Sequence, residues 1–313
     1  MSATTISKVS RVQDKPAATT KVREPFRDRM FLVVITIMLA VVLALVLLPL
    51  IFIVASSFSS TAAVNAGRVS FWPVDFSLHA YRVVLTDPQV LKGYYNSLIY
   101  AVAGTLISVT LTVAIAYPLS RKTFFGRNVL MTILIFTMLF SGGVIPTYMV
   151  VQNLGMLNTR WALLIPNAIG VWQVIIARTF FANSIPDELY EAAMLDGASE
   201  LRILRSVVLP LSKPLLAVLA LMYGVYQWNT YFDAMIYLKD PGLYPLQIVL
   251  RNMLILSQTR PGAMDLAQAM AQMQLVNVLK YALIVISSLP VLIIYPFIAR
   301  HFSKGAMVGA VKG

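Results

Sequence analysis

The sequence predicts an all-α, polytopic membrane protein of six transmembrane helices, with a cytoplasmic loop between the fourth and fifth helices. Of the 313 residues, 58% are hydrophobic and only 12% are charged, whereas soluble domains carry about 25% charged residues. The apolar residues occur in runs long enough to cross a bilayer, and most charged residues lie outside these runs. A charged stretch, residues 184–212, separates the fourth run from the fifth.

Six apolar segments have the length of a membrane-spanning helix, which needs about 20 residues. The first segment lies near the N-terminus, but its apolar run is longer than that of a signal peptide and follows a polar stretch. We therefore expect a retained helix at this position. The expected spans are 30–54, 94–119, 129–151, 160–182, 213–237 and 278–300.

The basic residues predict the orientation, because cytoplasmic loops of membrane proteins are enriched in Lys and Arg. Most of the 25 Lys and Arg residues fall on the cytoplasmic side if both termini are cytoplasmic. The net charge of +12 then reflects topology rather than a nucleic-acid partner. The domain prediction is a disordered cytoplasmic tail at 1–28, a six-helix transmembrane domain at 29–300 and a cytoplasmic C-terminal tail at 301–313.

The residue inventory excludes several kinds of chemistry. There is no Cys, and His occurs only at His79 and His301, so thiolate catalysis and Cys- or His-rich metal sites are excluded. No G-x-x-x-x-G-K-[ST] phosphate-binding loop is present. Among the 13 acidic residues only Asp233 approaches an expected span, which is a poor inventory for a proton relay. We therefore expect no catalytic residue, no metal site and no cofactor in this chain.

The acidic residues gather in the loop between the fourth and fifth spans, where five of the 13 lie between Asp187 and Glu200. The segment around them predicts a short helix, with Ser184 as its cap and Pro186 in its first turn. Negative charge near the start of a helix is stabilised by the helix dipole. Gly197 supplies the left-handed residue that ends such a helix.

A second helix is predicted directly after this glycine. Ser199 is suited to cap it, and Pro210 and Pro214 mark the bend into the fifth span. Spacing alone also fits an amphipathic helix that lies on lipid headgroups. The apolar residues that recur at helical spacing are Leu201, Leu204, Val208 and Leu211.

The same loop contains a regularly spaced motif of acidic, small and apolar residues. Its members are Glu191, Ala192, Ala193, Gly197, Val207, Leu209 and Pro210. They match the EAA–x3–G–x9–I–x–L–P signature of bacterial ABC-importer permeases, with Val207 in place of the usual Ile. The resemblance extends over roughly residues 30–313 and is closest to the carbohydrate-uptake branch, the MalG-like permeases, and within it to the LplC/YtcP group. The segments SGGVIPTYMVVQNLGMLNT and LYPLQIVLR also resemble that group.

The resemblance implies that the loop is a coupling helix that docks into a cleft of a partner ATPase, which would bind ATP and Mg. The implied assembly contains a second homologous permease subunit, two copies of the ABC ATPase and an extracytoplasmic solute-binding protein. It would lie among the lipids of the bacterial cytoplasmic membrane. The residues implied in ATPase coupling are Glu191, Ala192, Ala193, Asp196, Gly197, Ala198, Leu209 and Pro210.

Sugars are bound by hydrogen-bonding side chains together with flat apolar faces, and the stretch MYGVYQWNTYFDAMIY of the fifth span combines both. An aromatic belt at the outer interface is the alternative, although such a belt does not need the amide side chains. For the candidates in the second and fourth spans, the alternative is core packing. The candidate pathway residues are Tyr226, Gln227, Trp228, Asn229, Tyr231, Asp233, Trp172, Gln173 and Asn96.

These features together predict a permease subunit that translocates oligosaccharides into the cell and is driven by ATP hydrolysis in partner subunits. A permease for peptides, amino acids or a polyol phosphate is an alternative, and a stand-alone secondary transporter or channel is a more distant one. The C-terminal segment HFSKGAMVGAVKG is predicted either to fray or to reach toward the ATPase pair.

Overall fold

The computed structural model describes residues 26–256 and 277–296. The chain divides into two units at the boundary between Leu50 and Ile51, and each unit is described by itself. Every regular element in the described residues is a helix, which confirms the predicted all-α class for this part of the chain. The predicted tails lie outside the described residues, apart from the few residues at which α1 begins.

Helix α1, Phe26–Ser57, contains the first expected span. Its residues up to Leu50 belong to the first unit. Apolar side chains there, such as Leu39 and Leu45, are exposed by 58% and 67%. A helix that is apolar on all sides and this long is typical of a membrane span.

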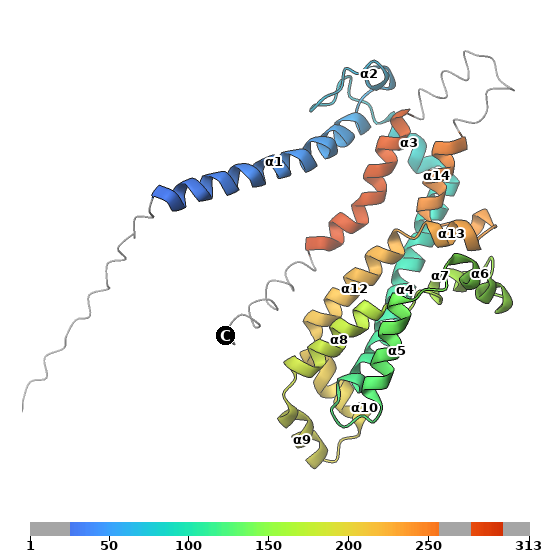
Figure 1. Ribbon diagram of the computed structural model, residues 1–313. Helices are drawn as coiled ribbons and strands as arrows, with labels where there is room; N and C mark the ends of the chain where they lie inside the picture. Colours follow the sequence, from blue (N-terminus) through green and yellow to red (C-terminus); the bar gives the residue numbers. More distant parts are fainter. Residues whose placement is uncertain (1–25, 257–276, 297–313) are drawn as a thin grey trace, which may run out of the picture. The chain divides into compact units, whose positions relative to one another are not determined.

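The second unit is organised around α4, Pro88–Ser120. This helix begins before the expected residue 94 because the Asp87 carboxylate accepts the backbone N–H groups of Gln89 and Val90, and Pro88 occupies the first turn. In Figure 1, α4 extends from α3, His79–Thr86, to the region of α9 and α10. It packs against α12, α8 and α14, whose bounds are Lys213–Trp228, Val171–Ser184 and Leu246–Leu256.

The third expected span, 129–151, is interrupted. It consists of α5, Arg127–Leu139, and α6, Val144–Asn153, and the chain bends by 114° between the two helices. The break falls at Ser141-Gly142-Gly143, where Gly143 has a φ of +85°. A right-handed helix needs a negative φ, so the helix cannot continue through Gly143, and glycine is the residue that adopts a positive φ readily.

The fourth expected span, 160–182, is also interrupted. Its first part is the short helix α7, Trp161–Leu164, and its second part is α8. Pro166 lies between them, and a proline disfavours helical backbone in the residue that precedes it. The fifth expected span ends as a continuous helix at Trp228, and the short helix α13, Phe232–Tyr237, follows.

Within the described residues, three helices are long and apolar enough to cross a membrane, namely α1, α4 and the last helix, Asn277–Pro296. The number rises to five if each of two bent pairs counts as one span. One pair is α5 with α6, and the other is 200–211 with α12, bent by 83°. Six continuous spans are therefore not observed in residues 26–256 and 277–296, because breaks divide the third, fourth and fifth predicted segments.

Shorter helices occupy the connections that the sequence places outside the membrane. They are α2, Thr61–Asn65, α3, and the 3-10 turn η2, Pro241–Leu243. The last helix packs with α3 and α14 in one apolar cluster that includes Val84, Leu246 and Leu283.

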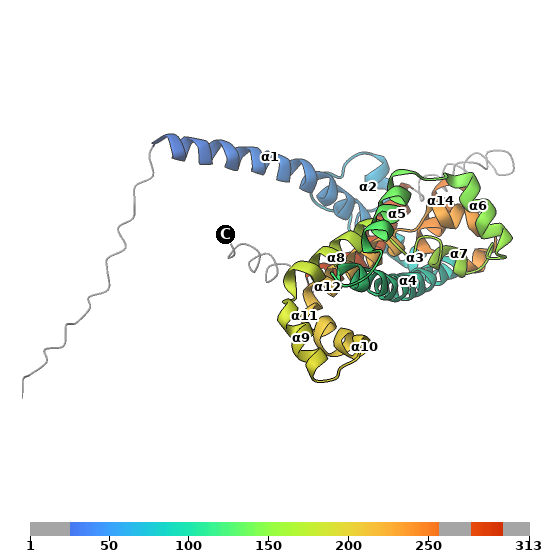
Figure 2. The ribbon, with the colours of Figure 1, turned by 60° about the horizontal axis from the view of Figure 1, so that its bottom comes forward.

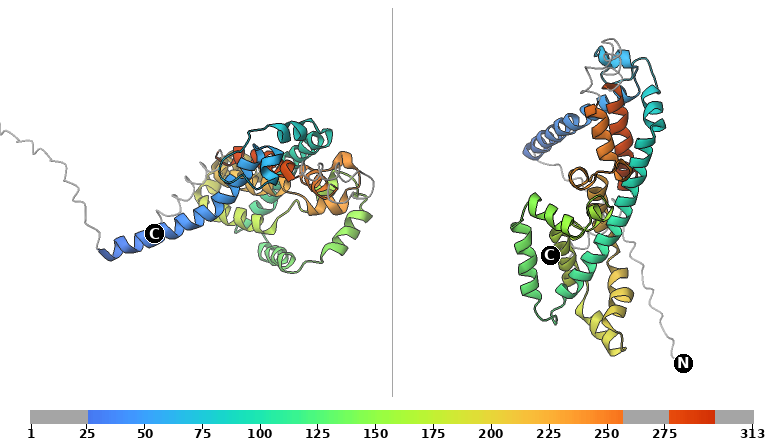
Figure 3. Two further views of the ribbon diagram at one scale, coloured as in Figure 1. Left: turned by 90° about the horizontal axis from the view of Figure 1, so that it is seen from above. Right: turned by 90° about the vertical axis from the view of Figure 1, so that its right-hand side faces the viewer.

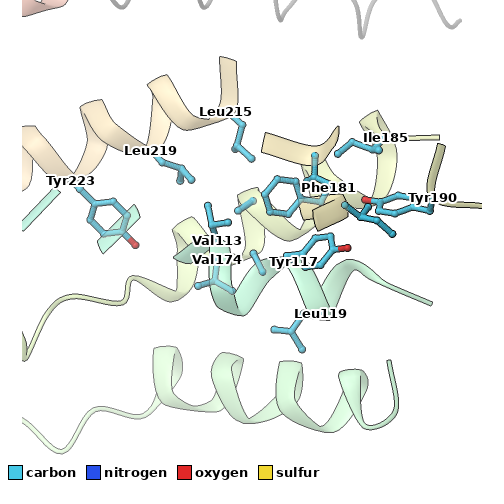
Figure 4. Close-up of a cluster of buried hydrophobic side chains, with 14 residues drawn as sticks. Val113, Tyr117, Leu119, Val174, Phe181, Ile185, Tyr190, Leu215, Leu219 and Tyr223 are labelled. Carbon is cyan, nitrogen blue, oxygen red and sulfur yellow. The ribbon is translucent and has the colours of Figure 1, made fainter. Parts of the chain in front are cut away.

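A second apolar cluster lies at the opposite end of α4, where α8, α12 and the loop 184–212 meet it. Figure 4 shows this cluster extending from Tyr223 on α12 through Val174 and Phe181 to Tyr190. The loop that carries the motif is therefore packed onto the helices by a continuous core.

Candidate functional site

The first helix of the motif loop is α9, Asp187–Leu195. Ser184 is the last residue of α8 and does not cap α9, because the residue at the cap position is Pro186, in an extended conformation. The predicted cap was therefore placed too early, and α8 continues further than expected. Gly197 has a φ of +73°, which confirms the predicted left-handed turn.

The second helix of the loop is not a regular α-helix. It consists of α10, Glu200–Ile203, a π-helical turn η1, Leu204–Val208, and α11, Leu209–Leu211. Ser199 occupies the cap position of α10, but its side chain makes no capping hydrogen bond. The chain then bends by 83° into α12, where the two prolines had predicted a bend.

The π-helical turn changes which residues of this helix face the core. Ile203 and Val208 are buried, whereas Leu201 and Leu211 are exposed by 65% and 51%. Leu201 and Leu211 therefore do not pack on the core, whereas Val208 does. A π turn has more residues per turn than an α-helix, so it shifts the phase of Leu211, which follows it, but not that of Leu201, which precedes it.

The two helices lie together at one end of the second unit, as Figures 2 and 3 show. The residues implied in coupling divide into two groups. Ala193, Ala198 and Leu209 pack against the core beneath the loop. The exposed members are Glu191, Ala192, Asp196, Gly197 and Pro210.

Three polar contacts hold the loop on the end of α4. The guanidinium of Arg121 lies 3.5 Å above the ring of buried Tyr190. The Tyr117 hydroxyl donates to a Glu200 carboxylate oxygen at 2.6 Å. Lys122 Nζ donates to Asp187 Oδ2 at 2.8 Å.

The pKa values of the loop follow from these contacts. The hydrogen bond and the charge of Lys122 lower the pKa of the exposed Asp187 carboxyl. Burial raises the pKa of the Tyr190 phenol, against the opposing charge of Arg121. Both groups therefore keep at neutral pH the charge state on which the loop contacts depend.

The candidate pathway residues do not form one surface. Asn96, Gln227 and Trp228 are buried, and Gln173 and Asp233 are half-buried. The remaining candidates, Tyr226, Asn229, Tyr231 and Trp172, are exposed.

One polar cluster surrounds the half-buried Asp233 and includes the exposed candidate Tyr226. Its Oδ2 accepts hydrogen bonds from the Tyr226 hydroxyl at 3.3 Å and from Asn167 Nδ2 at 2.8 Å. Tyr231 lies nearby in sequence, and Arg251 stands 5.9 Å from the centre of its ring. Amide, phenol and carboxylate groups beside exposed aromatic rings have the chemistry that binds a sugar.

Comparisons with known proteins identify the family of the chain. No family model matches the chain. Protein LplC of Bacillus subtilis (strain 168) is 42% identical over 270 residues, 86% of this chain and 90% of LplC. The polygalacturonan/rhamnogalacturonan transport system permease protein YtcP of the same organism is 40% identical over 287 residues, 92% of this chain and all (100%) of YtcP. The chain belongs to the carbohydrate-uptake permeases of ABC transporters.

A crystal structure of a bacterial ABC transporter involved in the import of the acidic polysaccharide alginate contains a chain that is similar to this permease. The two chains are 35% identical with a TM-score of 0.81, over 90% of this chain and 100% of the other. A second alginate-transporter structure, in complex with an alginate pentasaccharide-bound periplasmic protein, shares the fold at 16% identity and a TM-score of 0.51. The relatives are transporter permease subunits and not enzymes.

The buried candidates of the permease hold its helices together. Asn96 Nδ2 donates to the carbonyl oxygens of Gly242 and Tyr244 at 2.9 and 3.1 Å. Its Oδ1 accepts from Arg160 Nη2 at 2.9 Å. The Trp228 indole N–H donates to the Ser287 carbonyl at 2.9 Å. Asn96 and Trp228 therefore have packing roles in this structure, which for Asn96 was the alternative, and their contact with a solute stays a prediction.

Gln227 is fully buried, and both polar atoms of its amide lack a hydrogen-bond partner among the described residues. It lies so close to Gly104 of α4 that a Cβ added to this glycine would come within 2.6 Å of its side chain. Gln227 therefore lies at the contact between α4 and α12 and not on an exposed surface, and its contact with a solute stays a prediction.

Three residues of the permease that the sequence analysis did not select have defined roles. Arg160 and Asn167 support the polar contacts described above, and Tyr190 anchors the loop. The sequence offered a signal for two of them, because Arg160 is a cation and Asn167 an amide within the otherwise apolar fourth span. Among the described residues, no group of three His, Asp or Glu side chains is arranged to hold a metal ion.

Proposed function

We propose that this permease subunit translocates oligosaccharides across the bacterial cytoplasmic membrane into the cell. The observation that carries the proposal is the loop at the end of α4, where Glu191 and Ala192 are exposed and Ala193 packs on the core. This arrangement presents the motif to another protein on a rigid support. The likeness to YtcP and to a chain of an alginate importer supports the class of solute, and the likeness to the importer supports the direction of transport.

The energy source in this proposal is a separate ATPase pair. Each ATPase would bind ATP and Mg, and α9 would dock into a cleft on its surface. Glu191 would supply a charge-assisted contact, and Ala192 would allow a close approach because it has almost no side chain. Closure of the ATPase pair would move the loop as one body, since the core beneath the loop and the three polar contacts resist deformation.

The proposed assembly contains a second homologous permease subunit, two ATPase copies and an extracytoplasmic solute-binding protein. Both termini would be cytoplasmic, with the motif loop on the same side, in agreement with the distribution of Lys and Arg. The solute would pass the exposed polar cluster of Tyr226, Asp233 and Asn167, which offers both donors and acceptors to sugar hydroxyl groups.

Two of the relatives favour an acidic oligosaccharide as the solute, because their names concern polygalacturonan and alginate. Uptake by cells that express the complete transporter tests this point. We expect accumulation of labelled oligosaccharides cut from polygalacturonan or alginate, with maltodextrin as the neutral comparison. Uptake of peptides, amino acids or a polyol phosphate instead would overturn the assignment of the solute.

The coupling role is tested by Glu191→Gln with Glu188→Gln as the matched control, since both glutamates are exposed on α9 and only Glu191 belongs to the motif. Loss of one charge-assisted contact, about 1.5–3 kcal/mol, predicts a fall of about tenfold or more in ATP-dependent uptake for Glu191→Gln alone. Affinity purification of the chain is the second measurement. Recovery without an ATPase or a second permease, together with uptake that needs no ATP, would indicate a stand-alone transporter.

A further inference from the structure

A basic cavity of about 300 Å³ lies beside the motif loop. Residues from the end of α4, the start of α5, the C-terminal half of α8 and the start of α9 line it. Four of the lining residues are cations, namely Arg121, Lys122, Arg127 and Arg178. Such a concentration of positive charge in one hollow is unusual in a chain with only 12% charged residues.

The residues that line the cavity include too few carboxylates to neutralise its four cations. Asp187 is the only carboxylate among the lining residues, and it is paired with Lys122 at 2.8 Å. Arg178 Nε donates to the backbone carbonyl of Leu119, at 3.4 Å, and not to a carboxylate. Arg121 Nε is buried without a hydrogen-bond partner among the described residues. Arg121, Arg127 and Arg178 are half-buried, and the one lining carboxylate is already paired, so the cavity is suited to an anion.

An apolar groove of about 360 Å³ lies between α4 and α5, next to the basic cavity. It is lined by Ile115 and Leu119 of α4 and by Leu130, Ile133 and Leu134 of α5. The two hollows adjoin at Leu119, which lines the groove and whose backbone carbonyl accepts a hydrogen bond from Nε of the cavity residue Arg178 at 3.4 Å. Leu130 of the groove also lies one turn after Arg127 of the cavity. An anion that fits both hollows has a charged head and an apolar tail.

We propose that the cavity binds the phosphate headgroup of an anionic phospholipid and that one of its acyl chains lies in the groove. Arginine is the side chain best suited to phosphate, because its planar guanidinium donates two parallel hydrogen bonds. Basic pockets between transmembrane helices on the cytoplasmic side are sites where anionic headgroups bind. The apolar groove distinguishes a lipid from free phosphate, which has the same charged chemistry and no tail.

The bound lipid would also contact the motif loop. Arg121 reaches from the cavity to Tyr190 of α9, over whose ring its guanidinium lies. The headgroup therefore completes a charged layer between α4 and α9. The inference rests on the placement of this chain in a membrane and does not depend on which solute it carries.

Lipid binding by the full-length chain, purified with the proteins that accompany it, tests the proposal. The complex is delipidated in detergent and titrated with phosphatidylglycerol and phosphatidylcholine, and bound lipid is counted by native mass spectrometry without ATP or solute. We expect saturable binding of phosphatidylglycerol. Arg127→Gln and Arg178→Gln should each weaken it about tenfold, which corresponds to one lost charge-assisted contact.

Two controls separate the cavity from general surface charge and the lipid from free phosphate. Lys213→Gln removes an exposed cation at the start of α12 that does not line the cavity, and its binding should be unchanged. Ile133→Trp fills the groove and should weaken the lipid but not glycerol phosphate. Equal affinity for inorganic phosphate and phosphatidylglycerol, or unchanged lipid binding in both arginine variants, would overturn the proposal. If one arginine variant fails to fold, the other still decides the outcome.

Discussion

The hydroxyl of Tyr117, near the end of α4, donates a 2.6 Å hydrogen bond to the carboxylate of Glu200, the first residue of α10. The two residues are 83 positions apart in sequence. This bond connects the longest helix of the second unit to the second helix of the motif loop. Together with the contacts of Arg121 and Lys122, it determines how firmly the loop follows α4.

Removal of this hydroxyl should loosen the loop without unfolding the protein. Tyr117→Phe deletes a hydrogen bond to a charged group, worth about 2 kcal/mol, and keeps the aromatic ring in the core. We expect less solute transported per ATP hydrolysed in reconstituted transporter. Tyr95→Phe is the control, since Tyr95 is 62% exposed on the same helix. An unchanged ratio in Tyr117→Phe would show that the bond does not stiffen the loop.

There is space for a side chain at Gly197, but we predict that the backbone conformation of this position disfavours residues other than glycine. A Cβ built at this position meets nothing within 4 Å, and the φ of +73° is unfavourable for most residues. Gly197→Ala should therefore cost about 1 kcal/mol, and Asn should cost less because it adopts the left-handed region more readily. ATP-dependent uptake measures the effect. Gly197→Pro, which cannot adopt a positive φ, should abolish coupling while the protein stays inserted in the membrane.

Asn96 is predicted to affect stability and not the affinity for solute. Asn96→Ala leaves Arg160 Nη2 and two backbone carbonyl oxygens without their partner. Unpaired buried groups of this kind cost about 3 kcal/mol in the free energy of unfolding. Asn229→Ala is the comparison, because exposed Asn229 donates only to the Val225 carbonyl of its own helix.

Unfolding in mixed micelles measures the stability of both variants, and uptake gives the KM for solute. We expect a less stable Asn96→Ala protein with an unchanged KM. A raised KM at full stability would instead return Asn96 to the solute pathway, as the sequence analysis had it.

Gly104 is predicted to be required for the contact between α4 and α12. Gly104→Ala places a Cβ 2.6 Å from the buried side chain of Gln227, so we expect a loss of about 2 kcal/mol from overpacking. Gln227→Ala in the same chain should restore part of that stability. Gly224→Ala is the matched control, since the nearest atom to its new Cβ is Thr105 Oγ1 at 3.4 Å. Equal losses for the two glycines would contradict the proposed contact.

Features that depend on short-range chemistry could be predicted from the amino-acid sequence. Long apolar runs predict membrane helices because backbone groups in lipid must be hydrogen-bonded within the segment. The turn at Gly197 follows from the conformational freedom of glycine, and the motif around Glu191 follows from spacing. Each of these predictions requires only residues within a few turns of each other. The all-α class, the left-handed turn and the family were therefore predictable.

The contacts of the polar residues within the helices depend on how distant parts of the chain pack together. Asn96 donates hydrogen bonds to carbonyl oxygens 146 and 148 positions away. The side chain of Gln227 packs against Gly104 of another helix. Averaging over a spanning segment also hides a break such as the one at Gly143, because one glycine hardly changes the mean hydropathy of its neighbours. Polarity indicates that a side chain needs a partner, but the packing of distant helices determines which partner it meets.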